Sequence, residues 1–255
     1  MCEIFGFSAE HGQNINEYLR SFYSHCVDHP NGWGYVGFNK NGRTEILCTE
    51  PVRADVSERL PGLLDKSLEY PTVLAHIRQA TVGRVCLENC HPFARRDCSG
   101  RQWTLVHNGT VFSGLEIVPY LSQQVGDTDS EGILLYLVDQ IDREIKHVGR
   151  ELRPFERFQV AERVVGKLAR RNKLNLMFFD EEQIYVHTNM QHTLFSKTCE
   201  DGILFATSPL SERGWKPMPM TTLFAYRDGK LLYRGENHHN EYVEVMEMPS
   251  YEYQI

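Results

Sequence analysis

Strand patterns and helix patterns come in blocks along this chain, and this order constrains the fold more than any other feature. Strand-like patterns dominate the first 107 residues, two helical patterns follow between residues 129 and 171, and short strand patterns fill residues 174–233. A parallel α/β sheet would instead show strict alternation of strands and helices. The chain of 255 residues can bury an ample core, so we expect one α+β domain with two packed sheets.

The first block contains five predicted strands and one helix. Apolar residues at helical spacing predict a helix from Ile15 to Cys26, with Asn14 as a candidate cap. Residues 84–101 contain cysteine, proline, glycine and charge without a period, which predicts a long loop of the kind that often carries function. The predicted strands are residues 3–9, 33–39, 44–49, 72–77 and 103–107.

The second block contains two helices, and the third contains five strands. Residues 127–130 offer capping oxygens before an apolar stripe from Ile133 to Ile145, and a further helix is expected over residues 154–171. Asp228-Gly229 predicts a hairpin turn, and residues 236–255 form a polar tail without a pattern. The predicted strands of this block are residues 174–179, 183–188, 203–207, 222–227 and 230–233.

Composition excludes several broad classes of protein. The net charge is -7 and no long basic stripe occurs, so nucleic acid is not an expected partner. No stretch approaches the roughly 18–20 apolar residues of a membrane helix, and the start lacks a signal-peptide layout, so we expect a cytoplasmic protein. The seven cysteines include no CxxC pair, which predicts reduced thiols rather than a disulfide framework.

Cys2, directly after Met1, is a candidate nucleophile. Removal of an initiator methionine is favoured before a small side chain, and it would leave a thiol and an α-amine on the same residue. An α-amine has a pKa of about 7.7–8.0, so near neutral pH it can accept the thiol proton. The alternative is an ordinary buried thiol that opens a strand, and position alone favours this alternative.

His107-Asn108-Gly109 follows a predicted strand and suits an oxyanion site. The amide of Asn108 and the backbone N–H of Gly109 can both point at a developing negative charge, and glycine permits close approach. In isolation the Asn-Gly pair is more simply a turn.

Two further groups could hold a charged substrate. Arg78, at the end of a predicted strand, could bind a carboxylate through two hydrogen bonds, with the hydroxyl of Thr81 beside it. Asp129 could bind a cationic amine at the start of a helix. The simpler alternatives are a surface ion pair for Arg78 and helix capping for Asp129.

Taken together and in order, these segments resemble the class II glutamine amidotransferases, and the resemblance is closest to the stand-alone branch of YafJ-like and γ-glutamyl hydrolase-like proteins. It extends over nearly the whole chain, including residues 174–180 and 206–210. The segments that carry it are Met1 to Gly6, His29 to Tyr35, His76 to Thr81, Glu88 to Phe93, His107 to Gly109 and Gly126 to Glu131.

The resemblance implies an N-terminal nucleophile hydrolase fold, a four-layer αββα sandwich of two antiparallel sheets. It implies a single domain over residues 1–255 after removal of Met1, with small-molecule glutamine or a γ-glutamyl compound as substrate. It also implies that Cys2 is the nucleophile, that Asn108 and Gly109 form the oxyanion hole, and that Arg78, Thr81, His107 and Asp129 bind the substrate.

Two positions depart from the biosynthetic members of that family. Those enzymes have glycine after the cysteine and tryptophan after the arginine, whereas this chain has Glu3 and Gln79. Those enzymes also carry a fused synthase domain, whereas about 120 residues follow the amidotransferase motifs here, so we expect any ammonia acceptor to be separate. Three functions therefore stay open: glutamine hydrolysis that supplies a separate synthase or acceptor subunit, hydrolysis of γ-glutamyl amides without ammonia transfer, and non-catalytic binding on the same fold.

A zinc-binding protein is a further alternative to these three functions. Its candidate ligands are Cys86, Cys90, His91 and Cys98, but the C-x3-C-H-x6-C spacing is not a usual zinc pattern. The adjacent His238 and His239 would diverge on a strand, so a solvated turn is the simpler interpretation. The sequence therefore predicts no metal and no cofactor.

Overall fold

Two antiparallel sheets form the centre of the protein. The computed structural model describes residues 1–244. One sheet has the spatial order β11 (Lys216–Pro217), β9 (Phe195–Cys199), β10 (Gly202–Ala206), β1 (Glu3–Asn14), β4 (Glu69–Ile77), β2 (Trp33–Phe38) and β3 (Thr44–Glu50). The other has the order β13 (Lys230–Arg234), β12 (Phe224–Arg227), β8 (Ile184–His187), β7 (Lys173–Phe179), β6 (Gln102–Thr110) and β5 (Phe93–Arg96).

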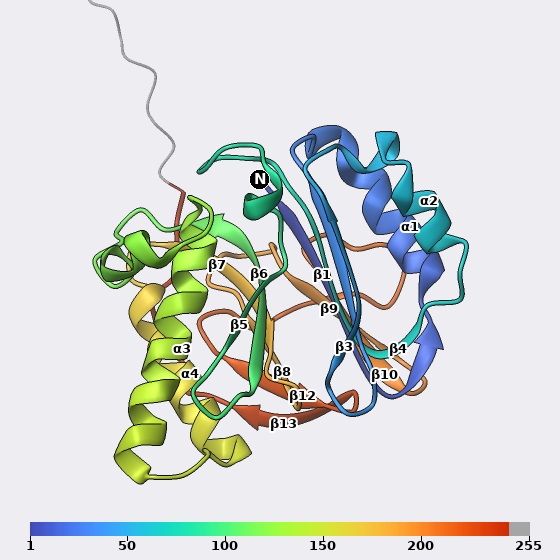
Figure 1. Cartoon of the computed structure of the whole chain (residues 1–255). Helices are drawn as coiled ribbons and strands as arrows, with labels where there is room; N and C mark the ends of the chain where they lie inside the picture. The colour runs from blue at the N-terminus through green and yellow to red at the C-terminus, as the bar shows by residue number, and fades with distance from the viewer. Residues whose placement is uncertain (245–255) are drawn as a thin grey trace, which may run out of the picture.

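Helices cover the outer face of each sheet (Figure 1). Helices α1 (Asn16–Ser24) and α2 (Arg59–Leu64) lie on the sheet that contains β1, and α3 (Asp129–Val148) and α4 (Pro154–Leu168) lie on the sheet that contains β6. The four layers therefore follow the predicted αββα order. The short 3-10 helices are η1 (His25–Asp28), η2 (Ala54–Val56), η3 (Leu87–Asn89) and η4 (Val118–Gln123). None of the helices within residues 1–244 is both long and apolar enough to cross a membrane.

The period-2 alternation of the central strands builds three apolar layers. On β1, Ile4 faces the second sheet and packs with Leu74 and Val106, while Phe5 faces α1 and packs with Phe22. On the other sheet, the helix-facing side packs against α3 and α4. Each fully buried Leu or Phe contributes about 1.5–3 kcal/mol relative to an exposed one. The strand faces are therefore specified on both sides, which fixes the register of β1.

The start of α3 is held by a dense set of local hydrogen bonds. Thr128 is the N-cap, and its hydroxyl accepts from the backbone N–H of Glu131 at 3.3 Å. The carboxylate of Glu131 in turn accepts from the backbone N–H groups of Val125 and Gly126. The helix ends at Gly149, whose φ of 72° suits glycine. The predicted capping segment at residues 127–130 is confirmed, with Thr128 as its capping residue.

Several boundaries differ from the sequence predictions. Strand β1 continues to Asn14, and Ile15 occupies the N-cap position of α1, while the Asn14 side chain accepts from the N–H of Asn16, the first residue of the helix. The prediction that residues 84–101 form only a loop was wrong, because they contain η3 and β5. On β5 only Phe93 is buried, so the sequence of this edge strand lacks the alternation of apolar and polar residues that would have predicted it. Helix α2 and strands β9 and β11 were also missed, because they are short.

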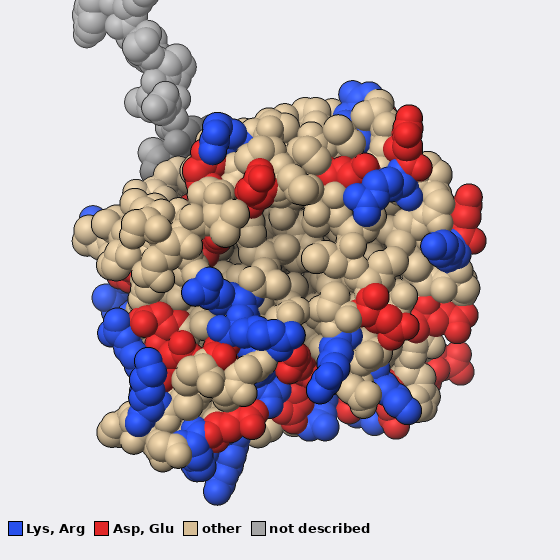
Figure 2. All heavy atoms as spheres, in the orientation of Figure 1, with Lys and Arg blue, Asp and Glu red and all other residues tan. Residues whose placement is uncertain are grey.

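Exposed apolar side chains gather in the segment that precedes α3. On the face drawn in Figure 2, charged side chains are frequent along the lower edge and on the right, and the bulge at the left carries few of them. The exposed residues of this segment are Phe112, Leu115, Val118, Leu121 and Val125. The surface beside the start of α3 is thus markedly less charged than the opposite end of the molecule.

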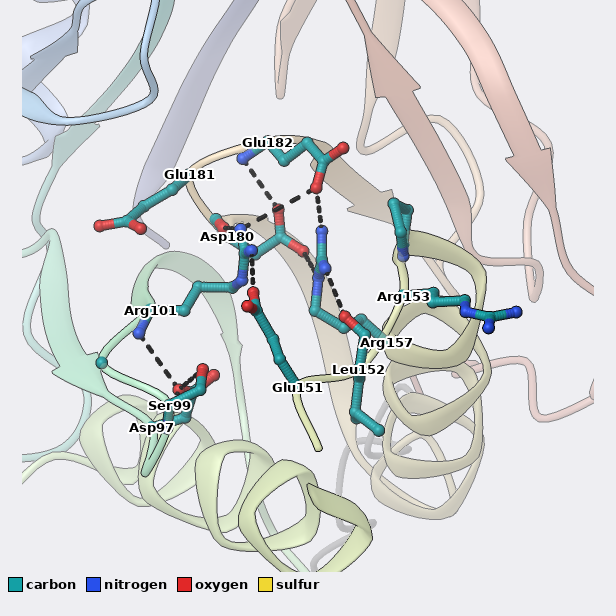
Figure 3. Close-up of polar contacts among 12 residues, drawn as sticks. Asp97, Ser99, Arg101, Glu151, Leu152, Arg153, Arg157, Asp180, Glu181 and Glu182 are labelled. Atoms are coloured by element: carbon teal, nitrogen blue, oxygen red, sulfur yellow. Dashed lines mark hydrogen bonds and ion pairs between the residues drawn. The ribbon is translucent and has the colours of Figure 1, made fainter. Parts of the chain in front are cut away.

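A buried ionic network ties α4 to the turn between β7 and β8 (Figure 3). Arg157 is 2% exposed, and its Nε lies 2.6 Å from Oδ2 of the fully buried Asp180. Asp180 also accepts from the hydroxyl of Tyr185 at 2.9 Å and from the backbone N–H of Gln183 at 2.8 Å. Glu182 forms a second ion pair with Arg157. The Asp180 carboxylate therefore depends on Arg157 for its compensating charge.

We predict that Arg157→Ala destabilises the protein by about 3–5 kcal/mol, because it leaves the Asp180 carboxylate buried without a counter-charge. The free energy of unfolding from urea denaturation measures this effect. The matched control is Arg163→Ala on the same helix, which breaks an exposed pair with Glu144 and should cost about 1 kcal/mol or less. Equal losses in the two variants would contradict the role of the network.

Candidate active site

Cys2 and Asn108 meet where a central strand of each sheet ends. Ile4 and Val106 both face the space between the sheets, and strand alternation gives Cys2 and Asn108 the same direction. Figure 1 shows the N-terminus at the upper end of β1, beside β6. The two residues line one pocket of about 300 Å3, whose other lining residues are Met1, Glu3, His192, Thr193, Thr207 and Ser208. The structure thus brings the predicted nucleophile and one predicted oxyanion donor into the same pocket.

The Cys2 thiol is partly buried and bonds to the segment that follows β4. Its Sγ donates to the backbone carbonyl of Gln79 at 3.3 Å, and the terminal ammonium of Met1 donates to the side-chain Oε1 of Gln79. Burial raises the pKa of the Cys2 thiol, although the bond to Gln79 and the positive charges of the terminus and Arg78 act in the opposite direction. A base is therefore required before this thiol can act as a nucleophile near neutral pH.

Asn108 and Gly109 are held by the pairing of β6 with β7. Oδ1 of Asn108 is buried and has no hydrogen-bond partner among residues 1–244, so this amide oxygen is not used to hold the fold. A Cβ on Gly109 would lie 1.9 Å from the carbonyl oxygen of Lys173, so only glycine fits this strand pairing. The turn alternative for Asn108-Gly109 is wrong, because both residues lie inside β6.

Arg78 is buried and organises the loop that follows β4. Its guanidinium donates to the carbonyl oxygens of Arg84 at 2.9 Å, Val82 at 3.0 Å and Gly83 at 3.3 Å. The surface ion-pair alternative is therefore wrong, since the side chain is only 2% exposed. Thr81 lies exposed on the same loop. Neither residue lines the pocket around Cys2, although the positive charge of Arg78 acts to lower the pKa of the thiol.

Asp129 and His107 lie behind the pocket and join β6 to the start of α3. Oδ2 of Asp129 accepts from the backbone N–H of Val111 at 2.8 Å, and Nδ1 of His107 lies 2.9 Å from the hydroxyl of Ser130. Burial raises the pKa of the Cys2 thiol most, and the negative charge of Asp129 acts in the same direction. His107 is buried among these groups, and it anchors β6 next to Asn108.

Sequence reasoning missed Thr207, Ser208, His192 and Thr193 as pocket residues. Strand β10 pairs with β1, with Ala206 opposite Phe5, and this pairing carries the next two residues to the nucleophile. The N–H of Ile4 donates to the hydroxyl of Thr207 at 3.2 Å. A pairing over 200 residues leaves no local signal in the sequence. The resemblance did include residues 206–210, and this was the one available indication.

Two of the candidate metal-binding residues, Cys90 and Cys98, make other contacts. Sγ of Cys90 donates to the carbonyl of Cys86, and the backbone N–H of Cys98 donates to Asp142 on α3. Within the described part of the chain, no three His, Cys, Asp or Glu side chains gather as a set of metal ligands. The prediction of a solvated turn at residues 238–239 was wrong for His238, whose Nε2 lies 2.9 Å from Nε2 of the buried His187.

Comparison with known proteins agrees with this geometry. The family model of the class-II glutamine amidotransferases matches residues 1–199. The chain belongs to that family. The protein YafJ of Escherichia coli (strain K12) is 28% identical over 201 residues, which cover 74% of each chain. The gamma-glutamyl-hercynylcysteine sulfoxide hydrolase of Mycolicibacterium smegmatis is 26% identical, over 87% of this chain and 88% of that protein.

A solved structure extends the comparison to the fold. The glutamine phosphoribosylpyrophosphate amidotransferase of B. subtilis superposes with a TM-score of 0.63 at 17% identity. The match covers 93% of this chain and 49% of that enzyme. The expected α+β architecture, the four-layer αββα sandwich of the N-terminal nucleophile hydrolases, is thus confirmed. About half of this larger enzyme has no counterpart in the matched region.

Buried histidines lie around and behind the site. The rings of His76 and His91 stack with centroids 4.0 Å apart, and both nitrogens of His91 have no partner within residues 1–244. Burial lowers the pKa of His76, His91 and His107, and it lowers the pKa of His187 to about 3. The folded protein therefore holds four neutral imidazoles that the unfolded chain would protonate below pH ~6.5.

We predict that the free energy of unfolding falls as the pH drops below about 6.5, because only the unfolded state then gains these protons. Each buried histidine adds a slope of up to about 1.4 kcal/mol per pH unit. His25 works in the opposite sense, since its bond to Glu3 raises its pKa. Urea denaturation between pH 7.5 and 5 measures the slope.

The matched variants for this experiment are His187→Asn and His11→Asn. His187→Asn removes one buried titrating group and should reduce the slope by up to about 1.4 kcal/mol per pH unit. His11 is exposed, so His11→Asn should leave the slope unchanged. A wild-type stability that does not change over this pH range would contradict the analysis.

Proposed function

We propose that this chain, once Met1 is removed, hydrolyses the side-chain amide of glutamine or of a γ-glutamyl compound through a thioester on Cys2. The observation that carries the proposal is the shared pocket of Cys2 and Asn108 at the ends of two central strands. Membership of the class-II family supports this chemistry. The same pocket offers a nucleophile, a place for its base and a donor for the oxyanion.

In the first step the α-amine of Cys2 acts as the base. While Met1 is present, the nitrogen of Cys2 is a peptide N–H and cannot accept a proton. After removal of Met1 it becomes an amine with a pKa of about 7.7–8.0, and it takes the thiol proton. The thiolate then attacks the amide carbon to form the C–S bond.

In the second step the negative charge on the amide oxygen is stabilised by the Asn108 side chain and the Gly109 N–H. Each such donor lowers the barrier by about 2.7–4 kcal/mol. When the C–N bond breaks, the leaving nitrogen takes the proton from the α-ammonium group and departs as ammonia or an amine. Water then cleaves the γ-glutamyl thioester, which releases glutamate and restores the thiol.

The glutamyl part of the substrate would bind on the side of Arg78, Thr81 and Asp129. The guanidinium of Arg78 has five N–H donors, and its three bonds to loop carbonyls leave part of this capacity for a carboxylate. Asp129 would bind the α-ammonium group at the start of α3. This assignment requires the loop at residues 79–85 to adjust when substrate binds, because Thr81 now lies exposed.

A hydrolase without ammonia transfer is a second candidate function. It is favoured by the similarity to a γ-glutamyl hydrolase over most of both chains. Transfer of ammonia would involve a synthase or acceptor subunit, and the match to the phosphoribosylpyrophosphate amidotransferase covers 49% of that enzyme. Products from glutamine and from γ-glutamyl dipeptides would separate the two functions. Retention of Met1 in cells would favour a non-catalytic binding role.

We predict that Asn108→Ala lowers the turnover of Met1-free protein by on the order of a hundredfold or more, since one oxyanion donor is lost. Release of glutamate from glutamine and γ-glutamyl peptides measures turnover, and Cys2→Ala sets the background. Asn41→Ala, in the exposed turn between β2 and β3, is the matched control and should keep full activity. A folded Asn108→Ala with wild-type turnover would refute the oxyanion assignment.

A further inference from the structure

The strand order divides the surroundings of Cys2 into two sides. Strand β1 lies between β4 and β10, so Arg78 and Gln79 follow β4 on one side of the nucleophile. Thr207 and Ser208 follow β10 on the other side. Arg78, the proposed carboxylate-binding group, lies on the β4 side, and Asp127, two residues before Asp129, bonds to Arg84 of the loop that follows β4. An extended γ-glutamyl amide that spans the thiol would therefore place its amine part on the β10 side.

The pocket itself opens toward the β10 side. Four of its residues come from the segments that follow β8 and β10: His192, Thr193, Thr207 and Ser208. Neither Arg78 nor Asp129 contributes to its lining. The space of about 300 Å3 beside the thiol is therefore situated to receive what is attached to the scissile nitrogen.

Among the described residues that line this pocket, Glu3 is the only acidic one, and none is Lys or Arg. Adjacent residues of a strand point to opposite faces, so the Glu3 side chain leaves β1 on the face opposite the thiol, and the link of its carboxylate to the pocket runs through Ser208, which lines that pocket. Its Oε1 accepts from the hydroxyl of Ser208 at 3.0 Å, and its Oε2 lies 2.8 Å from Nδ1 of His25 on η1. The side chain is 14% exposed, so the carboxylate is both fixed in place and accessible.

We propose that Glu3 and Ser208 form the leaving-group end of the site, and that they select γ-glutamyl amides whose amine part carries a positive charge. This inference rests on the proposed function, and it names the substrate class of the same pocket. A fixed and partly desolvated carboxylate attracts a cation more strongly than a mobile surface carboxylate does. The net charge of -7 also favours cationic over anionic compounds.

His25 sets how much of the Glu3 charge remains for a ligand. Its ring is 32% exposed, and in the protonated form it balances part of the carboxylate charge. Replacement of His25 by glutamine would keep a hydrogen-bond donor and remove this positive charge. Variants at Glu3 and His25 should therefore change the preference for a cation in opposite directions, which a purely structural link between β1 and η1 would not do.

The test compares two substrates that differ only in the charge of the amine part: the γ-glutamyl amides of 1,4-diaminobutane and of butylamine. In Met1-free wild-type protein, kcat/KM should be about tenfold or more higher for the cationic amide, as expected for one charge-assisted hydrogen bond. Glu3→Gln should bring the ratio of the two values close to one, and His25→Gln should increase it. Glu10→Gln, at the far end of the same strand, is the control and should leave the ratio unchanged.

The outcomes separate this inference from the proposed function. A Glu3→Gln variant that loses activity equally on both amides would show a structural link and overturn the inference. If wild-type protein turned over neither of these amides and also left glutamine intact, the proposed function would fail. Calorimetric binding of both amides to Cys2→Ala would then still test the subsite: a preference for the cationic amide that disappears in Cys2→Ala/Glu3→Gln supports it, and equal binding overturns it. Circular dichroism melting confirms that each variant is folded.

Discussion

The pairing of β1 between β4 and β10 is the interaction on which the rest of the site depends. It pairs Glu3 with Ile77 and brings the Cys2 thiol to the carbonyl of Gln79 on one side, and it brings Ile4 to Thr207 on the other. The apolar faces of β1 are buried against α1 and against the second sheet, so a register shift by one residue would turn Ile4 and Phe5 to the wrong layers. The direction of Cys2 into the space between the sheets follows from this register.

The two ends of the sandwich have different physical characters. At the lower end, the Asp180 carboxylate is saturated with hydrogen bonds from Arg157, Tyr185 and backbone N–H groups, and this end holds α4 on its sheet. At the upper end, Oδ1 of Asn108 has no partner within residues 1–244, and the Cys2 thiol has a raised pKa. Polar groups that make no hydrogen bond within the fold are free to bind a ligand. The groups that stabilise the fold and the groups proposed to react therefore lie at opposite ends of the strands.

The sequence predicted local features well and long-range contacts poorly. Alternation located the central strands, and capping residues located α3, because these signals lie within a few neighbouring residues. Cys2, Asn108 and Gly109 came from chemistry and resemblance, and the structure places Cys2 and Asn108 in one pocket. The contacts of Arg78 with the loop at residues 82–84, and the arrival of Ser208 at Glu3, depend on pairing and loop closure that no local pattern encodes.

The central claim is that Cys2, with a free α-amine, is the nucleophile. The most direct test is intact mass and peptide mapping after Met1-free protein reacts with an electrophilic diazoketone analogue of glutamine. We predict one adduct per chain, located on Cys2, and a strong loss of labelling when Met1 is retained. Labelling that is located on another of the seven cysteines, or that is equally fast with Met1 in place, would contradict the account.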